Sequence, residues 1–333
     1  KSGNDYEFGI QEKENAIDGG ILCFTREDAE KLLSISIKKE EDLQELLKAA
    51  NEIREKFCGK FFNLCTILNA KSGRCSEDCK YCAQSAHFKT AAEVYPLVKK
   101  EKALEAAKEV ESEGAHRFSL VTSGRGLNGK EKELDQLTKI YQYLQENTNL
   151  DLCASHGICS KEALQKLKDA GVKTYHHNLE SSRRFYGTIC TSHTFDDRVN
   201  TIKYAHEVGL QVCSGGIFGL GETEEDRIDM AFDLRELGVH SVPINILTPI
   251  PGTPLENNEA VNPKELLKDI AIFRFILPKV SIRYAGGRVK LGEYAKLGLE
   301  GGVNSALTGN FLTTTGNTIE SDKQMIKELG YEY

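Results

Sequence analysis

The sequence predicts an α/β fold, a TIM-type (β/α)8 barrel with an N-terminal helical extension. Short apolar runs rich in β-branched residues alternate along the chain with amphipathic stretches whose apolar residues repeat every three to four positions. Strands that alternate with helices pair in parallel through βαβ units, and a closed barrel is the most economical arrangement of eight such units. A doubly wound open sheet is the alternative.

Eight segments are predicted to be strands, because each is short, apolar and followed by polar or glycine-rich sequence: Phe62–Ile67, Arg117–Thr122, Leu150–Ser155, Thr174–Asn178, Gln211–Phe218, Ser241–Leu247, Val280–Tyr284 and Gly302–Ala306. Six intervening stretches have the helical period: Glu101–Glu113, Glu131–Gln145, Lys161–Ala170, Asp196–Val208, Glu224–Leu237 and Pro263–Leu277. Four helices are followed by a glycine where a helix would end, at Gly114, Gly171, Gly209 and Gly238.

The region before the first strand has a different pattern. Residues 1–60 contain no strand signal and are predicted to form a helical lead-in, with its clearest helix at Leu43–Phe57. Residues 61–333 are predicted to form the barrel domain, because no linker, repeat or low-complexity tract divides them.

The composition is that of a globular protein, with 40% hydrophobic and 28% charged residues. No run approaches the roughly 18–20 apolar residues of a membrane span, and the polar first residues do not resemble a signal peptide. A net charge of −7, with basic and acidic residues interspersed, argues against a nucleic-acid partner. Ten cysteines without an export signal indicate a cytoplasmic protein whose thiols serve metal binding or catalysis.

Three cysteines in the run RCSEDCKYCAQSAHF are the strongest candidates for metal ligands. Cys75, Cys79 and Cys82 have the spacing C-x3-C-x2-C. Three thiolates can hold three irons of a four-iron cluster and leave the fourth iron open for a small molecule, whereas closed structural sites take four protein ligands. A zinc site formed by the same cysteines and His87 is the alternative, and unmetallated structural thiols are a third possibility.

A glycine-rich turn, GGIFGLGE from Gly215 to Glu222, ends the fifth predicted strand. Glycines allow close backbone approach, so this turn can cradle a polar ligand, although its spacing is not that of a dinucleotide fingerprint. Both motifs follow predicted strands, where barrel enzymes place their catalytic groups. The chain shows no serine–histidine–acid motif. Three histidines lie in or beside predicted strands, His156, His176 and His177, and for each a structural role is the alternative to a catalytic one.

The cysteine run, with Tyr81 before its last cysteine, resembles the C-x3-C-x-aromatic-C motif of radical S-adenosylmethionine (SAM) enzymes. Further segments resemble the biotin synthase family within that superfamily, in the order NAKSGRCSEDCKYCAQS (69–85), YHHNLESSRRFYG (175–187), VCSGGIFGLGET (212–223), SVPIN (241–245), PGTPL (251–255), IRYAGGR (282–288) and NSALTGNFLTTTGN (304–317). The resemblance implies conversion of dethiobiotin to biotin, with two C–H bonds broken by deoxyadenosyl radicals and sulfur taken from an auxiliary iron–sulfur cluster inside the barrel.

The same resemblance implies roles for particular residues. Cys75, Cys79 and Cys82 correspond to the ligands of a 4Fe-4S cluster that binds SAM at its open iron. Positions near SAM correspond to Tyr81, Asn178, Glu180, Gly215, Gly216 and Ile217. Asn178 and Asn245 correspond to amides that bridge SAM and dethiobiotin, since an amide offers both donors and acceptors; loop capping is their alternative role. Glu180 stands where the family usually has aspartate.

The auxiliary site departs from the family pattern. The family holds a 2Fe-2S centre with three cysteines and an arginine, and Cys153, Cys213 and Arg283 correspond to three of these ligands. The remaining position is Ser119, whose hydroxyl is a poor substitute for a thiolate.

We therefore predict that the auxiliary cluster is re-ligated by four thiolates, those of Cys65, Cys153, Cys190 and Cys213, which are the normal complement of a four-iron cluster. A two-iron centre held by Cys153, Cys213, Arg283 and an unidentified fourth group is the alternative. Cys65 shares one strand face with Asn63 and Ile67, so it is predicted to point into the barrel. Arg283 is then a nearby cation rather than a ligand. Cys159 is a possible substitute ligand, Cys23 and Cys58 are predicted to be structural, and a core role is the alternative for Cys65 and Cys190.

The resemblance also implies partners: dethiobiotin as substrate, reduced flavodoxin or ferredoxin as electron donor, and a second copy of the chain in a homodimer. Two other functions remain open at this point. One is another radical SAM barrel enzyme, of the hydrogenase-maturation or mutase type. The other is a non-catalytic zinc or redox-sensing protein, which metal analysis would distinguish.

Overall fold

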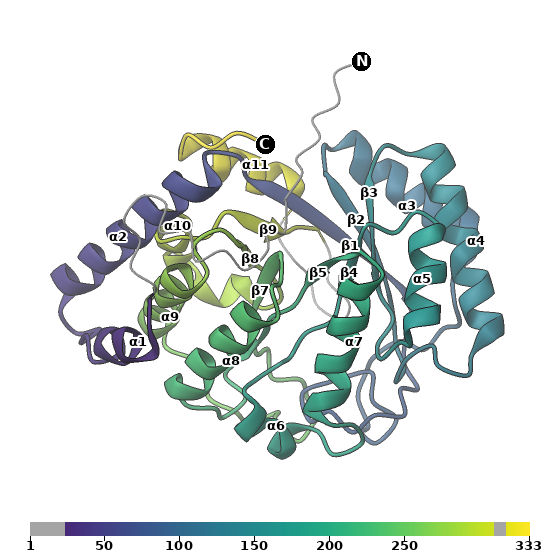
Figure 1. The fold of residues 1–333 in the computed structure, drawn as a ribbon, viewed down its shortest axis with the longest axis horizontal. Coiled ribbons are helices and arrows are strands. Elements are labelled where there is room, and N and C mark those ends of the chain that lie inside the picture. Colours follow the sequence, from purple (N-terminus) through teal and green to yellow (C-terminus); the bar gives the residue numbers. More distant parts are fainter. Residues whose placement is uncertain (1–23, 310–317) are drawn as a thin grey trace.

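The computed structural model describes residues 24–309 and 318–333. Within these residues the strands form one parallel sheet in the order β5-β4-β3-β2-β1-β9-β8-β7-β6, and a further pairing of β5 with β7 closes it (Figure 1). β5 and β6 together occupy one barrel position. The predicted eight-stranded (β/α)8 barrel is therefore confirmed, and the open-sheet alternative is excluded.

The strands are β1 (Asn63–Lys71), β2 (Arg117–Thr122), β3 (Asp151–Ser155), β4 (Thr174–His176), β5 (Gln211–Cys213), β6 (Gly216–Phe218), β7 (Ser241–Ile246), β8 (Ser281–Tyr284) and β9 (Ser305–Leu307). The helices surround them and are α1 (Arg26–Leu33), α2 (Glu40–Cys58), α3 (Lys100–Ser112), α4 (Glu131–Asn147), α5 (Lys161–Asp169), α6 (Arg183–Ile189), α7 (Phe195–Glu207), α8 (Glu224–Glu236), α9 (Pro263–Ile276), α10 (Tyr294–Glu300) and α11 (Ile319–Glu328), with a short 3-10 helix η1 (Arg288–Leu291).

The fifth predicted strand is interrupted. Ser214 and Gly215 separate β5 from β6, and a Cβ atom on Gly215 would lie 2.1 Å from the carbonyl oxygen of Pro243. Only glycine permits this approach of two backbones. The glycines were visible in the sequence, but the break that they allow depends on the neighbouring strand β7.

Several short elements were not predicted. α6 and α10 have seven residues each, which is too short for a helical period to stand out. α1 and α11 were missed as well, and β9 begins three residues later than the predicted strand at Gly302. The longer helices agree with the prediction to within a few residues, because their apolar faces pack on the barrel.

Strand alternation divides the interior into two zones. Outward side chains such as Leu64, Leu120 and Val212 are fully buried in the core between the strands and the helices. The inward faces hold polar side chains and thiols, including Cys65, Cys153 and Cys213, which lie outside that apolar core. The barrel thus carries its chemistry inside and its hydrophobic packing outside.

The helix predicted at residues 43–57 is confirmed as part of α2. Its apolar face packs against α9 in a separate small core of Leu43, Leu46, Leu47, Ala50, Leu267 and Ala271. The division of the chain at residue 60 into a lead-in and a barrel domain remains a prediction. Within the described ranges, no helix has the length and apolar character that a membrane crossing requires.

A buried ion pair joins α11 to η1. The Arg288 guanidinium donates hydrogen bonds to both carboxylate oxygens of Asp322, at 2.9 and 2.8 Å, and the two side chains are 2% and 1% exposed. Replacing Arg288 removes a bidentate cation from the buried Asp322 carboxylate.

We expect Arg288→Met to lower the free energy of unfolding by about 3–5 kcal/mol, measured by urea denaturation. Lys161→Met is the matched control, because it breaks the Lys161–Glu207 ion pair, whose side chains are 51% and 49% exposed. An exposed pair contributes no more than about 1 kcal/mol. Equal losses in the two variants would contradict the importance of the buried pair.

Candidate active site

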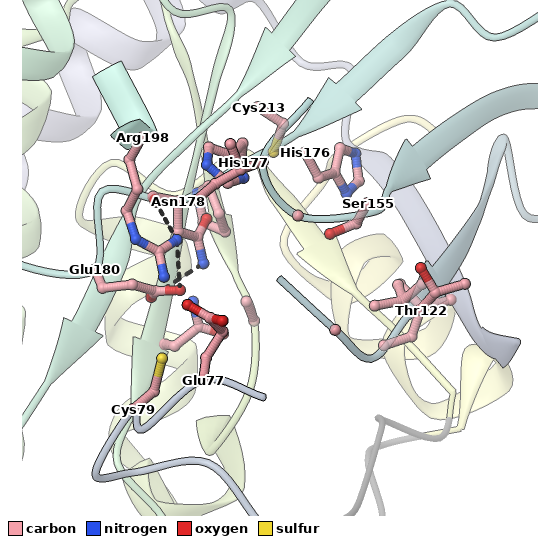
Figure 2. A pocket seen from close by; sticks show the side chains of 18 of the residues that line it. Glu77, Cys79, Thr122, Ser155, His176, His177, Asn178, Glu180, Arg198 and Cys213 are labelled. Atoms are coloured by element: carbon pink, nitrogen blue, oxygen red, sulfur yellow. Dashed lines mark hydrogen bonds and ion pairs between the residues drawn. The ribbon is translucent and has the colours of Figure 1, made fainter. Parts of the chain in front are cut away.

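A cavity of about 270 Å³ lies at the carboxyl ends of the barrel strands and among the loops that follow them (Figure 2). It brings together predicted site residues that are far apart in the sequence. The loop residues that line it include Cys75, Cys79, Asn178 and Glu180, and Asn245 of β7 lines it as well. On its barrel side it is lined by Cys213 and Arg283. The carboxyl end of the barrel is where this fold places active sites.

The three-cysteine loop begins directly after β1 and folds back on itself. The Cys75 N–H donates to the Gln84 carbonyl oxygen at 2.9 Å, and the Cys82 N–H donates to the Cys79 carbonyl oxygen at 3.0 Å. Burial raises the pKa of the Cys82 thiol to about 11, and the nearby Cys75 adds to the rise. A bound metal would stabilise the thiolates that burial disfavours, so this donor set suits a metal centre.

The spacing of these thiols bears on the kind of metal. Within the described residues, Cys75, Cys79, Cys82 and His87 do not form a group whose ligand atoms all lie within 4.8 Å of one another. The His87 ring instead has its Nε2 2.9 Å from the Ser76 carbonyl oxygen. A single zinc ion would need its ligand atoms within about 4 Å of each other. The arrangement therefore favours a multi-iron cluster over the zinc alternative.

Glu180 and Asn178 follow β4 and form one wall of the cavity. Asn178 Nδ2 donates to Glu180 Oε2 at 3.3 Å, and Glu180 Oε1 lies 3.7 Å from Arg198 Nη1 (Figure 2). Burial raises the pKa of Glu180, while Arg198 and the hydroxyl of Tyr81 oppose that rise. Glu180 also has φ +70°, an uncommon conformation for a residue other than glycine. Its N–H donates to the Gly215 carbonyl oxygen, and its carbonyl oxygen accepts from the Ile217 N–H.

The amides of Asn178 and Asn245 both hold backbone in place. Asn178 Oδ1 accepts from the Gly215 N–H at 3.2 Å. Asn245 Nδ2 donates to the Gly216 carbonyl oxygen at 3.1 Å, and its Oδ1 accepts from the Gly286 N–H at 3.0 Å. Both side chains also line the cavity. The loop-capping role is thus present, and a role toward a ligand stays a prediction.

A second group of thiols lies inside the barrel. Strand register places Ser119 of β2 beside Cys153 of β3, and Arg117 beside Cys65 of β1. The neighbouring Cys153 thiol lowers the pKa of Cys65 to about 6, and the Arg283 and Arg117 cations act in the same direction. The predicted inward orientation of Cys65 is confirmed.

Arg283 connects these thiols to the rest of the barrel. Its Nε donates to Ser305 Oγ at 2.8 Å and its Nη2 donates to Asn63 Oδ1 at 3.1 Å. It also interacts with the thiols of Cys65, Cys153 and Cys213, which raise its pKa against the effect of burial. Ser119 Oγ, by contrast, is a buried hydroxyl without a hydrogen-bond partner among the described residues. A polar or metallated group beside it would supply that partner.

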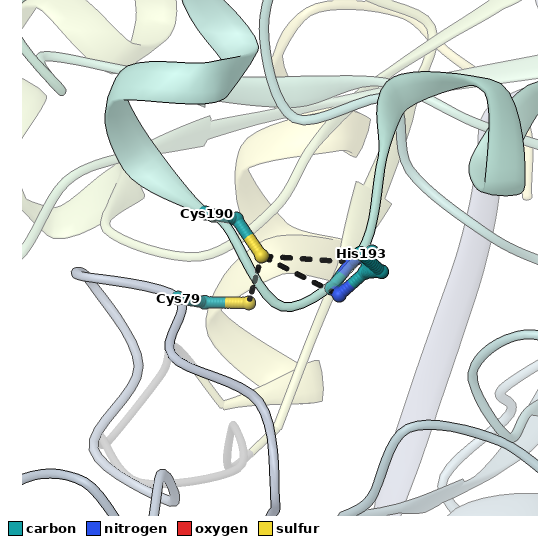
Figure 3. A group of neighbouring side chains, drawn as sticks. All are labelled: Cys79, Cys190 and His193. Atoms are coloured by element: carbon teal, nitrogen blue, oxygen red, sulfur yellow. Dashed lines mark hydrogen bonds between the residues drawn. The ribbon is translucent and has the colours of Figure 1, made fainter.

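The prediction that Cys190 joins the barrel thiols is wrong. Its Sγ lies 3.6 Å from Cys79 Sγ, in the loop after α6 (Figure 3). α6 was not predicted, and this short helix carries the chain back across the cysteine loop before α7 begins. Four barrel thiolates are therefore not available, and the ligand set predicted for a four-iron auxiliary cluster is incomplete.

The other cysteines considered as ligands or as structural thiols lie away from the barrel thiols or outside the described residues. Cys159 Sγ lies 3.1 Å from the Tyr175 hydroxyl in the apolar core, so it is not a substitute ligand. Cys58 is the thiol at the end of α2, 3.7 Å from the Pro278 carbonyl oxygen, which fits its predicted structural role. Cys23 lies outside the described residues.

The comparisons with known proteins identify the family. The Radical SAM superfamily pattern matches residues 70–234, and the Biotin and Thiamin Synthesis associated domain matches residues 243–332. A biotin synthase from Fusobacterium nucleatum is 72% identical over 309 residues, which are 92% of this chain and 86% of that protein. The chain belongs to the biotin synthase family. A biotin synthase from Campylobacter hominis is 56% identical over 321 residues, 96% of each chain.

Solved structures agree on the fold. Methylornithine synthase superposes with a TM-score of 0.81 at 22% identity, covering 93% of this chain and 94% of that one. The hydrogenase maturase HydG from Carboxydothermus hydrogenoformans gives a TM-score of 0.76 at 20% identity, covering 91% and 74%. At these identities the likeness concerns the barrel alone.

Family membership confirms the predicted activity. The enzyme is a radical SAM sulfurtransferase that converts dethiobiotin to biotin, with a 4Fe-4S cluster and SAM as cofactors. Neither another radical SAM activity nor a zinc or redox-sensing role is favoured.

Four ionisable residues of this site were not predicted from the sequence. Arg198 supports Glu180 and donates to the Asn178 carbonyl oxygen at 2.9 Å, while Glu77, Asp78 and His193 join the cysteine loop to the loop after α6. Arg198 was detectable as a basic residue close to the apolar face of a predicted helix. The other three depend on a contact between distant loops, which the sequence does not signal.

Proposed function

We propose that this enzyme inserts sulfur by holding dethiobiotin between two iron–sulfur centres that share the cavity. The observation that supports the proposal is the lining of that cavity, with Cys75 and Cys79 on its loop side and Cys213 and Arg283 on its barrel side. A substrate bound between these groups faces both centres. The arrangement matches a reaction in which a C–H bond is broken from one side and sulfur arrives from the other.

In this proposal Cys75, Cys79 and Cys82 hold the 4Fe-4S cluster, and SAM binds in the adjacent part of the cavity. The cluster and SAM, when bound, supply a carbon radical able to break unactivated C–H bonds, which no side chain could do. The chain contributes binding and orientation. Glu180, held by Arg198, accepts hydrogen bonds from SAM hydroxyls, the turn at Gly215, Gly216 and Ile217 allows close approach, and Tyr81 supports Glu180.

The Asn178 and Asn245 amides orient SAM and dethiobiotin relative to each other. Each amide already has contacts with backbone or a neighbouring side chain, so its position is defined before a ligand arrives. An amide oxygen has a second lone pair and an amide nitrogen a second hydrogen, so both can still bind the polar ureido ring.

For the auxiliary centre we propose that Cys65 takes the place left by Ser119. Cys65, Cys153 and Cys213 then supply three thiolates, with Arg283 among them. Two cations near Cys65 favour its thiolate form, which is the form that binds iron. Three thiolates and an arginine are the ligand complement of the family's two-iron cluster, and a four-iron cluster would have one iron without a protein thiolate.

The remaining expectations follow from family membership and composition. We propose reduced flavodoxin or ferredoxin as the electron donor, a homodimeric assembly, and a cytoplasmic location in keeping with the ten cysteines.

The first prediction from this proposal concerns the SAM cluster. Replacing Cys75, Cys79 and Cys82 together with alanine should abolish 5′-deoxyadenosine formation after anaerobic reconstitution and reduction, because the cluster that delivers the electron is lost. Cys58→Ala is the control, since this thiol contacts the Pro278 carbonyl oxygen away from the cavity, and it should match the parent. Parental deoxyadenosine from the triple variant would refute the assignment.

The second prediction concerns substrate orientation. Asn245→Ala should reduce biotin formation by roughly ten- to a hundredfold, because a lost buried hydrogen bond costs about 1–3 kcal/mol. Its cluster iron should equal the parent's. Asn258→Ala is the matched control: Asn258 Nδ2 donates to the Gly219 carbonyl oxygen at 3.1 Å on the same turn, but its side chain does not line the cavity. Similar losses in both variants would mean that Asn245 acts only by capping the loop.

The third prediction concerns the auxiliary centre. Cys65→Ala should lose auxiliary iron and biotin formation while keeping the SAM cluster and its deoxyadenosine chemistry. Cys159→Ala removes a thiol that is equally buried but lies in the apolar core, so it should keep both centres. Iron and sulfide analysis with Mössbauer spectroscopy makes the comparison. Full auxiliary iron in Cys65→Ala would rule out Cys65 as a ligand.

A further inference from the structure

Three buried side chains of types that bind metals, Cys79, Cys190 and His193, meet beside the cavity. Only Cys79 belongs to a ligand set proposed above, that of the SAM cluster. Cys79 Sγ lies 3.6 Å from Cys190 Sγ, and Cys190 Sγ lies 3.4 Å from His193 Nδ1 and 3.8 Å from His193 Nε2 (Figure 3). One ligand atom from each of the three residues lies within 4.8 Å of the others. Neither Cys190 nor His193 has a part in the proposed reaction.

We propose that Cys79, Cys190 and His193 form a binding site for one zinc-class ion, and that this ion competes with the SAM cluster for Cys79. The competition rests on the proposed function, because it requires Cys79 to be a cluster ligand. The zinc site itself rests on the geometry of the three side chains alone.

The distances suit a tetrahedral ion. Zn–S bonds of about 2.3 Å and Zn–N bonds of about 2.0–2.1 Å, at tetrahedral angles, place two sulfurs about 3.8 Å apart and a sulfur and a nitrogen about 3.5 Å apart. The Cys79–Cys190 separation of 3.6 Å and the Cys190–His193 Nε2 separation of 3.8 Å each lie within about 0.3 Å of these values. Cys190 Sγ lies nearer to His193 Nδ1, at 3.4 Å, than to Nε2, so an ion bound to Nε2 requires the imidazole to turn toward the two sulfurs.

The histidine is oriented by a carboxylate. His193 Nδ1 lies 2.5 Å from Glu77 Oε2. Donation from Nδ1 to that carboxylate leaves Nε2 without a proton and available to a metal, which is the usual support of a zinc-bound histidine. Ser192 Oγ and Ser76 Oγ also donate to Glu77, at 2.8 and 2.9 Å, so the carboxylate is itself fixed.

The two loops that carry the ligands are joined independently of any metal. Asp78 accepts from the Thr191 and Ser192 N–H groups at 2.9 and 3.0 Å, and the Lys80 N–H donates to the Ile189 carbonyl oxygen at 2.9 Å. These bonds hold Cys79 and Cys190 together before an ion arrives. A preformed ligand set reduces the ordering that binding would otherwise require.

The chemistry of the donors selects the ion. Two thiolates and one imidazole suit zinc and similar soft or borderline ions rather than magnesium or calcium. A cysteine binds such an ion as its thiolate, and two thiolates balance the charge of a divalent ion. Cys79 and His193 line the cavity, which provides an entry path and room for water as the fourth ligand.

When a zinc-class ion occupies this site in the cluster-free chain, it prevents assembly of the SAM cluster. Cys79 can serve the zinc-class ion or the iron cluster, but its sulfur cannot complete both sites. The cluster-loaded enzyme should therefore lack this zinc site, and the zinc-loaded chain should take up iron poorly.

The test uses the full-length chain, freed of iron anaerobically, and zinc chloride in competition with a chromophoric chelator. One zinc per chain should bind to the parent. Cys190→Ser and His193→Ala should weaken zinc binding by at least about tenfold, and Glu77→Gln should weaken it by roughly tenfold, as loss of a supporting carboxylate does. Cys75→Ala and Cys82→Ala are the controls and should bind zinc as the parent does. Cobalt charge-transfer bands should report two thiolates in the parent and one in Cys190→Ser.

Two results would overturn the proposal. If Cys75→Ala and Cys82→Ala lose zinc while Cys190→Ser keeps it, the ion sits on the three-cysteine loop. If His193→Ala and Cys190→Ser both bind zinc like the parent, the site does not exist. Urea unfolding of each apoprotein variant separates loss of the site from loss of the fold.

A second experiment measures iron uptake by the parent and by Cys190→Ser after zinc has been bound. Prior zinc should slow cluster reconstitution in the parent and have no such effect in Cys190→Ser. The same preparations test the cluster assignment separately, because Cys75→Ala should fail to build the SAM cluster whether or not zinc binds. Failure of the cluster assignment and failure of the zinc site therefore give different patterns.

Discussion

The passage of the chain from β5 to β6 is the constraint on which the site depends. At this point the backbone of Gly215 lies against the Pro243 carbonyl oxygen, so close that no side chain fits. Cys213, just before the break, pairs with Ser241 and closes the barrel, while Ile217 and Gly216 after it bond to Glu180 and Asn245. The same break therefore places a barrel thiol and supports both cavity walls.

The inward faces of the strands give the barrel an interior layer of thiols that is separate from the thiols of the cysteine loop. Successive residues of a strand point to opposite faces of the sheet. On three strands the residues next to Cys65, Cys153 and Cys213 pack against helices, so the three cysteines point inward. Burial opposes charge on these thiols, and Arg283 and Arg117 oppose that effect at Cys65. The loop thiols lie above this layer, and the cavity joins the two groups.

The cysteine loop is joined to a distant segment of the chain by hydrogen bonds. Glu77 and Asp78, which lie between two of its cysteines, bind the loop that begins at Cys190. Residues more than a hundred positions apart in the chain thus form one rigid unit around Cys79. This unit explains why Cys190, which a strand-by-strand view assigns to the barrel interior, belongs to the opposite end of the cavity.

The barrel, the three-cysteine loop and the inward position of Cys65 could all be predicted from the sequence. These features depend on local periodicity, strand alternation and short motif spacing, all of which can be read along the chain. The position of Cys190, the break at Gly215 and the contact of Arg198 with Glu180 could not be predicted in this way. Each of these depends on two segments that meet after folding, and the spacing of residues along one segment carries no information about the surface of the other.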